Sequence, residues 1–231
     1  MSIVLWILTL CSIFFAIKTS NEPVFELFKA TPFETLFKQF NTGNSFIFNL
    51  SIGFLVSVII YLLIVWIPDR RRKSLIKHNI EEQYRDFKEN TIYILLEACS
   101  EGANSDLVSK LCDQNYFRDY FRESISDSQT GWHAVFNGIA REEYFLKELS
   151  VELGILSNEV TFVRNNVNID DQDVFSFFRR LSHSVYKLKN TSLEDNDLKI
   201  LTKFLWEIFA GWSMIDGPRD EDIVKVMIAK I

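Results

Sequence analysis

The sequence predicts a membrane protein with an all-α cytoplasmic domain: two N-terminal transmembrane helices followed by a bundle of about six helices. Three observations predict this fold. Two apolar segments lie within the first 67 residues, a basic cluster follows the second segment, and the rest of the chain carries apolar residues at helical spacing. We therefore divide the chain into a two-span membrane region, residues 1–67, and a cytoplasmic α-helical domain, residues 68–231.

The second apolar segment is long enough to cross a bilayer. Phe46 to Ile67 is an uncharged run of 22 residues, and a spanning helix needs roughly 20. The first segment, Met1 to Ile17, is near the lower limit for a span, about 17 residues. A cleaved signal peptide is the alternative, but no basic residue precedes the apolar run and no small-residue cleavage motif follows it, so we favour a retained span.

A basic cluster sets the orientation in the membrane. Arg70, Arg71, Arg72 and Lys73 follow the second run directly. Positive residues that flank a span stay on the cytoplasmic side. We therefore expect a two-pass protein of the cell inner membrane, embedded in the lipid bilayer, with its C-terminus in the cytoplasm.

The segment between the two apolar runs predicts a short extracytoplasmic helix at residues 31–43. Thr31, Pro32 and Glu34 make a helix start with a capping box, and Gly43 provides a stop. One face of this helix is apolar and mostly aromatic; it carries Phe33, Leu36, Phe37 and Phe40. Such a face can lie on the outer membrane interface, pack against its copies in an oligomer, or belong to a simple connector.

A stripe of small and polar residues runs along the second span. Asn49, Gly53, Ser57 and Tyr61 recur every four residues, so they share one face of a helix. A small-xxx-small pair lets two backbones approach closely, and an Asn side chain can form a hydrogen bond across helices. The stripe predicts membrane helix packing, either between copies in a homo-oligomer or within one molecule.

The chain after the basic cluster has helical periodicity throughout, and no segment resembles a strand. We expect helices at residues 74–98, 106–123, 132–153, 159–167, 171–188 and 198–212, with a last helix that begins near Arg219. Gly154 should end the third of these helices. Pro68 should kink the first helix or separate it from the span.

The composition of the helical domain excludes several classes of function. Residues 78–231 hold 17 basic and 27 acidic side chains, so strong direct nucleic-acid binding is not expected. Three scattered cysteines do not form a disulfide framework. The three histidines, at positions 78, 133 and 183, show no metal-binding spacing. Cys112 and His133 lie on separate predicted helices and match no nucleophile pattern. We predict no catalytic residue, metal or cofactor, and a protein that is not an enzyme.

One stretch of the domain is unusually aromatic. "LWEIFAGWSMIDGPRDED" places Trp206, Phe209, Trp212 and Arg219 close together near the end of a predicted helix. Closure of the core would explain these residues. They also form a candidate site for docking a partner, because Trp and Arg are common anchors in interfaces.

The layout of the whole chain resembles the two-transmembrane effectors of bacterial anti-phage retron systems, through the "IPDRRRK" junction and the "REEYFLKE" and "LWEIFAGWSMIDG" segments of the body. The resemblance implies a toxin of antiviral defence that a cytoplasmic protein partner holds inactive, such as a reverse transcriptase with its RNA or DNA. Release would let the spans form a homo-oligomer and disrupt the inner membrane. The alternative is a membrane tether or sensor subunit that recruits a soluble partner through its helical domain.

Overall fold

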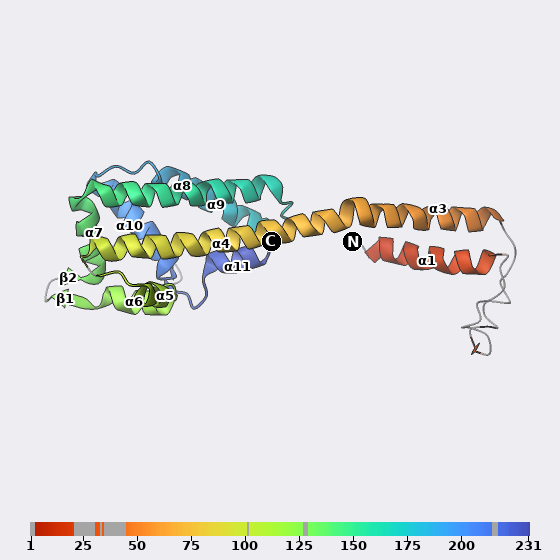
Figure 1. The fold of residues 1–231 in the computed structure, drawn as a ribbon, viewed down its shortest axis with the longest axis horizontal. Coiled ribbons are helices and arrows are strands. Elements are labelled where there is room, and N and C mark those ends of the chain that lie inside the picture. The colour runs from red at the N-terminus through yellow and green to blue at the C-terminus, as the bar shows by residue number, and fades with distance from the viewer. Residues whose placement is uncertain are drawn as a thin grey trace. The chain divides into compact units, whose positions relative to one another are not determined.

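The structure is a computed structural model that describes residues 3–20, 31, 32, 34, 45–100, 102–126, 129–213 and 217–231. The chain forms two compact units, Met1–Arg72 and Lys73–Ile231. In Figure 1 the helices of both units are coloured along the chain, from red at the N-terminus to blue at the C-terminus. The division falls a few residues beyond the boundary expected from the sequence, within the basic cluster.

The first unit is built on a pair of apolar helices. α1 spans Ile3–Thr19 and α3 spans Ser45–Tyr61, and the two lie side by side in opposite directions (Figure 1). Apart from the buried Lys18, the less exposed positions of α1 recur every three or four residues, at Leu5, Thr9, Ser12, Ala16 and Thr19. Small side chains thus make up most of this face, which is how membrane helices come close together.

One described helix is long and apolar enough to cross a membrane. It runs from Ser45 to Ala98, and only 11% of its apolar window is buried. The core helix of a soluble protein has the same composition but is mostly buried, so this exposure sets the helix apart. The second apolar helix, α1, has 17 residues, which corresponds to a length of about 25 Å. The described part of the chain therefore contains one helix of spanning length and one shorter apolar helix.

The helix does not end at Pro68. A π-helical turn, η2, spans Leu62–Trp66 and is followed directly by α4, Ile67–Ala98. The N–H of Ile67 donates to the carbonyl of Leu62, five residues back. Proline has no N–H to offer the helical ladder, and the wider π turn just before it belongs to the same local irregularity. The expectation that Pro68 could separate the two helices is wrong.

The second unit contains eight helices among its described residues, more than the six or so expected. After α4 come α5 Ser105–Leu111, α6 Gln114–Arg122, α7 Gly131–Arg141, α8 Glu143–Asn166, α9 Gln172–Leu188, α10 Asp195–Phe209 and α11 Ile223–Ala229. Two helices expected from the sequence are each split in two. The side chain of Asp113 accepts hydrogen bonds from two backbone N–H groups and so begins α6 separately.

Gly154 does not end a helix. α8 passes through it to Asn166, so the shorter helix expected at residues 159–167 is the last part of α8. A Cβ built on Gly154 meets nothing within 4 Å, and a single glycine inside a helix costs only about 1 kcal/mol relative to alanine. Packing of α8 against α9 along their lengths outweighs that cost.

Two short antiparallel strand pairs were not expected. β1, Ser124–Ser126, pairs with β2, Gln129–Thr130, and β3, Trp212–Ser213, pairs with β4, Gly217–Pro218. Strands of two or three residues are too short to show an alternating pattern in the sequence. Gly217 has a φ of 78°, the left-handed conformation that glycine adopts without strain.

The core of the second unit runs between all of its helices, and its tightest contact is backbone against backbone. α7 crosses the end of α4 at Gly138, where a Cβ would lie 1.9 Å from the carbonyl oxygen of Ala98. Only glycine allows this approach. The crossing brings α7 and α8 onto α4 and closes the core over Leu95 and Ile139, both fully buried.

Candidate functional site

The four residues expected to dock a partner do not share one surface. Phe209 is fully buried, with its ring centroid 5.4 Å from that of Phe117 and 5.8 Å from that of Phe87. A side chain in this position stabilises the core and presents nothing to a partner. For Phe209 the docking interpretation is wrong, and closure of the core explains the residue.

Trp206 belongs to an aromatic cluster between α6, α7 and α10. Its ring lies 5.0 Å from that of Trp132 and 6.1 Å from that of Phe117, centroid to centroid. The guanidinium of Arg122 lies 6.0 Å from the ring of Trp206 and 4.9 Å from that of Trp212. Arg122 therefore joins the two tryptophans by cation–π contacts, and Trp206 faces the cluster.

Trp212 and Arg219 are positioned by a turn held from α6. After α10, Gly211 reverses the chain with a φ of 57°, and the N–H of Arg219 donates to the carbonyl of Gly211 at 2.7 Å. The buried side chain of Arg118 donates to the carbonyl of Ala210 from Nε at 3.0 Å and from Nη2 at 2.8 Å. Nη2 also donates to the carbonyl of Arg219 at 3.2 Å. A cation at the carbonyl end of α10 is electrostatically favourable.

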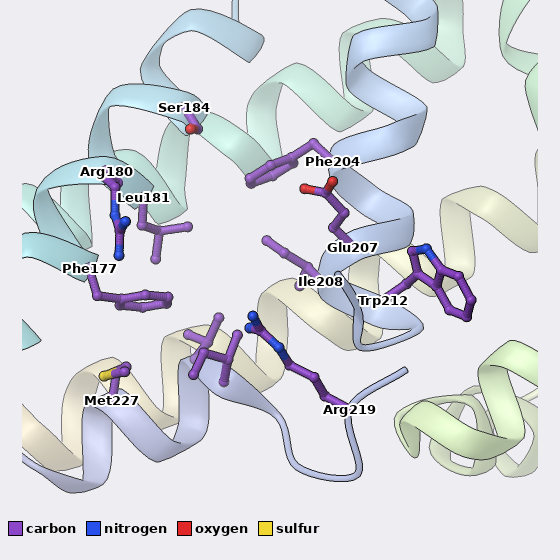
Figure 2. Close-up of a pocket in the computed structure, with 12 residues that line it drawn as sticks. Phe177, Arg180, Leu181, Ser184, Phe204, Glu207, Ile208, Trp212, Arg219 and Met227 are labelled. Atoms are coloured by element: carbon purple, nitrogen blue, oxygen red, sulfur yellow. The ribbon is translucent and has the colours of Figure 1, made fainter. Parts of the chain in front are cut away.

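Trp212 and Arg219 line a pocket of about 540 Å³ (Figure 2). Its walls come from α9, α10, α11 and the hairpin between α10 and α11. Figure 2 shows Glu207 and Arg219 extending into the space bordered by α9, α10 and α11, with Phe177 and Phe204 at its edge. The remaining lining residues are Arg180, Leu181, Ser184, Ile208, Ile223, Val224 and Met227.

A second pocket of about 270 Å³ continues the first. The two pockets share Ser184, Phe204 and Glu207, and the second adds Lys187, Leu188, Ile200 and Lys203. Together they form a groove between α9 and α10, here called the α9–α10 groove. Along α9 it extends from Phe177 to Leu188, which is about 16 Å at the rise of an α-helix.

The wall formed by α11 is fastened to α4 by a buried ion pair. Asp222 begins α11 by accepting the N–H groups of Val224 and Lys225. Its carboxylate also lies 3.2 Å from Nζ of Lys88 and 3.1 Å from the hydroxyl of Tyr84. The side chains of Lys88 and Asp222 are only 2% and 9% exposed. Here this group of Tyr84, Lys88 and Asp222 is called the latch.

The protonation of Tyr84 fits its hydrogen bond to the Asp222 carboxylate in the latch. Burial raises the pKa of the Tyr84 phenol, and the charge of Asp222 and the hydrogen bond to it raise that pKa further. The phenol therefore stays protonated and donates to the carboxylate. Nζ of Lys88 also donates to the carbonyl of Cys112 at 2.8 Å, so one buried lysine contacts both the start of α11 and the end of α5.

Cys112 and His133 do not line the groove. Burial raises the pKa of the Cys112 thiol, and a raised pKa lowers the fraction of reactive thiolate at neutral pH. His133 contacts Thr130, 3.3 Å from Nδ1 to Oγ1. Among the described residues no three His, Cys, Asp or Glu side chains cluster as metal ligands would.

The residues expected to pack in the membrane lie on the open side of α3. The positions of α3 nearest α1 include the buried Ser51 and Val58, whereas Asn49, Gly53, Ser57 and Tyr61 are not among the buried residues of α3. A Cβ on Gly53 meets nothing within 4 Å, and the hydroxyl of Ser57 donates to the carbonyl of Gly53 at 2.9 Å. The stripe thus takes no part in the closest contact with α1, and packing between copies is the interpretation that stays open.

The other expected membrane residues are only partly described. Of the helix expected at residues 31–43, the structure describes Thr31, Pro32 and Glu34, and the N–H of Glu34 donates to the carbonyl of Thr31 at 3.0 Å. The apolar face, Phe33, Leu36, Phe37 and Phe40, lies outside the described residues. In the basic cluster, Arg70, Arg71 and Arg72 are exposed, and Arg70 lies 5.3 Å from the ring of Trp66. Lys73 donates to the carbonyl of Asn168 at 3.1 Å.

Sequence reasoning missed most of the α9–α10 groove and the whole latch. One signal for the groove was present: Phe177, Arg180, Ser184 and Lys187 share a face of α9 and mix apolar with basic character. No pattern could have paired Lys88 with Asp222, because 134 residues separate them.

Comparison with protein families, with characterised proteins and with solved structures finds no match to this chain. Any assignment of function therefore rests on the physical properties of the two helices, the stripe and the groove.

Proposed function

We propose that the protein is a membrane-anchored toxic effector of anti-phage defence. In this proposal α1 and α3 cross the inner membrane as a hairpin, and the helical domain lies in the cytoplasm and binds a partner that holds the protein inactive. Release lets several copies assemble through their spans and disrupt the membrane. The observation that carries the proposal is the open stripe on α3, which lies away from the contact with α1.

The hairpin and the basic cluster support the membrane part of the proposal. α1 packs along α3 through small side chains, as helices do in lipid. α1 is short for a span, at about 25 Å against a hydrocarbon core of roughly 30 Å, and its partner helix supplies a full-length span beside it. Arg70, Arg71 and Arg72 would keep the helical domain on the cytoplasmic side.

The stripe supports assembly. Gly53 and Ser57 leave a shallow strip on which a second backbone can lie, and Asn49 can form a hydrogen bond across such a contact, worth on the order of 1 kcal/mol in lipid. The hydroxyl of Ser57 is bonded within its own helix, so it adds no unsatisfied polar group to the interface. α1 occupies another face of α3, so the hairpin and the assembly do not compete.

The helical domain supports a restraining protein partner. Its net charge of −10 over residues 78–231 disfavours direct nucleic-acid binding, so contact with a reverse transcriptase and its RNA or DNA would run through the protein. A membrane tether or sensor subunit is the second candidate. The α9–α10 groove supports the tether as well as it supports the effector, because a tether would recruit its soluble partner through the groove without any assembly of the spans.

Expression without any partner separates the two candidates. The effector should collapse the membrane potential and admit a membrane-impermeant dye, whereas a tether should do neither. Gly53→Ile should reduce the damage at matched membrane levels, because a Cβ at this position meets nothing within 4 Å in the single molecule, whereas a bulky side chain prevents the close approach of a second helix. Val56→Leu, a conservative change on an exposed position of the same helix, is the control and should behave as wild type. An intact membrane potential with wild-type protein would contradict the effector proposal.

A further inference from the structure

We propose that the α9–α10 groove binds an acidic amphipathic helix of a partner protein. Only one part of this inference rests on the proposed function: that the helix belongs to the partner that restrains the effector. Binding itself is a property of the helical domain and is measured without reference to membrane damage.

The charge of the groove is opposite to that of the domain around it. Among the described residues its lining includes four cationic side chains, Arg180, Lys187, Lys203 and Arg219, and one carboxylate, Glu207. Lys203 and Glu207 form an ion pair at 4.0 Å, so the positive charge that the groove offers an occupant comes from Arg180 and Lys187 of α9. The domain as a whole carries ten more acidic than basic residues. A concentration of cations on so acidic a body is complementary to an occupant with carboxylates.

The walls of the groove require that the occupant also be apolar. Ten of its lining residues are apolar, among them Phe177 and Phe204, which are only partly buried, and Ile200, which is 59% exposed. Exposed apolar side chains between charged rims are the usual form of a surface that a partner covers. A free anion or a nucleic-acid backbone would not use these contacts.

The length and direction of the groove fit a helix. Arg180 and Lys187 lie seven residues apart on the same face of α9, so they border two turns of any helix laid beside them. The groove covers about 16 Å of α9, which matches about three helical turns or 11 residues. A helix that lays its apolar face into a groove is a recurrent mode of peptide recognition. Its carboxylates on one flank would face Arg180 and Lys187 of α9.

The test uses two fluorescein-labelled helical peptides of about 14 residues with the same Leu face. One carries Glu on both flanks and the other Lys. The full-length protein is placed in nanodiscs of neutral phosphatidylcholine, and binding is followed by fluorescence polarisation. The Glu peptide should bind roughly tenfold more tightly than the Lys peptide, and added salt should weaken the binding.

Charge reversal decides whether the groove is the binding site. Arg180→Glu with Lys187→Glu should weaken the Glu peptide and strengthen the Lys peptide, which an unfolded variant could not do. Arg179→Glu changes the neighbouring exposed cation outside the groove and should leave both affinities unchanged. Phe204→Asp should weaken both peptides.

Three outcomes would overturn the proposal. They are equal affinity for the two peptides, affinities unchanged in the double charge reversal, and an equal loss of binding in Arg179→Glu. A single-stranded RNA probe that binds more tightly than the Glu peptide and is lost on the same charge reversal would reassign the groove to nucleic acid.

Discussion

The latch between Lys88 and Asp222 makes the sharpest prediction for stability. Asp222→Asn keeps a side chain that can cap α11 but removes the negative charge that faces Nζ of Lys88 at 3.2 Å. Lys88 is 2% exposed, so its ammonium would be left in the core without a counter-charge. Breaking a buried pair by removing one partner costs roughly 3–5 kcal/mol.

The expected loss is at the lower end of that range, about 3 kcal/mol. Lys88 keeps its hydrogen bond to the carbonyl of Cys112, and the amide oxygen introduced by the substitution can still accept from the hydroxyl of Tyr84. For a domain of this size a loss of about 3 kcal/mol lowers the melting temperature by roughly 6–12 °C. Lys88→Met with Asp222→Asn should recover part of the loss, because the double variant leaves no buried charge unpaired.

Thermal unfolding of the full-length protein in detergent, followed by circular dichroism, measures both variants. Hydrogen exchange adds the location: in Asp222→Asn the amides of α11 should lose protection before those of α8. The reasoning would be refuted by a loss below about 1 kcal/mol for the single variant, or by a double variant less stable than the single one. Either result would mean that the pair is solvated in the native protein.

Three further predictions concern backbone packing and charge. Gly138→Ala should lower the free energy of unfolding by about 3 kcal/mol or more, because the new Cβ would lie 1.9 Å from the carbonyl oxygen of Ala98. Gly154→Ala should instead raise the melting temperature, because a Cβ there meets nothing within 4 Å. The opposite ranking of the two melting temperatures would contradict the described crossing of α7 over α4. Glu152→Gln should stabilise the protein at neutral pH, because the pKa of Glu152 is raised. Burial is the largest cause, and the charges of Glu148 and Asp86 also raise this pKa, whereas the hydrogen bond from Asn90 lowers it. Because the folded-state pKa is raised, stability is fully present below the ordinary pKa of a glutamate and is lost as pH rises through the folded-state pKa. The advantage of Gln should therefore vanish in melting curves recorded below the ordinary pKa of glutamate. An advantage independent of pH would disprove this cause.

Periodicity made the helical domain predictable, but local capping decided where its helices begin and end. The apolar spacing of residues 106–123 continues across Asp113, and only the hydrogen bonds of the Asp113 side chain show that a new helix begins there. At Gly154 the reverse holds: glycine often follows the end of a helix, but here α8 continues through it because α8 packs against neighbouring helices. Composition and spacing describe what a segment can form, and packing selects among those forms.

The candidate site was predictable only where its residues are neighbours in the chain. Trp212 and Arg219 lie at the groove, as a docking interpretation of that stretch requires, but Phe209 turns into the core three residues before Trp212. The groove also needs Arg180 and Lys187 from α9, and its wall needs Lys88 from α4. These contacts depend on how distant helices pack, and a single sequence carries no direct signal for them.

Both proposed functions require that the helical domain lies in the cytoplasm. A fluorescent protein that matures only in the cytoplasm, fused after Ile231, should be bright, and alkaline phosphatase fused at the same position should be inactive. This result is expected because Arg70 to Lys73 would hold the helical domain on the cytoplasmic side. A dark fluorescent fusion with active phosphatase would place the domain outside, and would contradict both the restrained effector and the cytoplasmic tether.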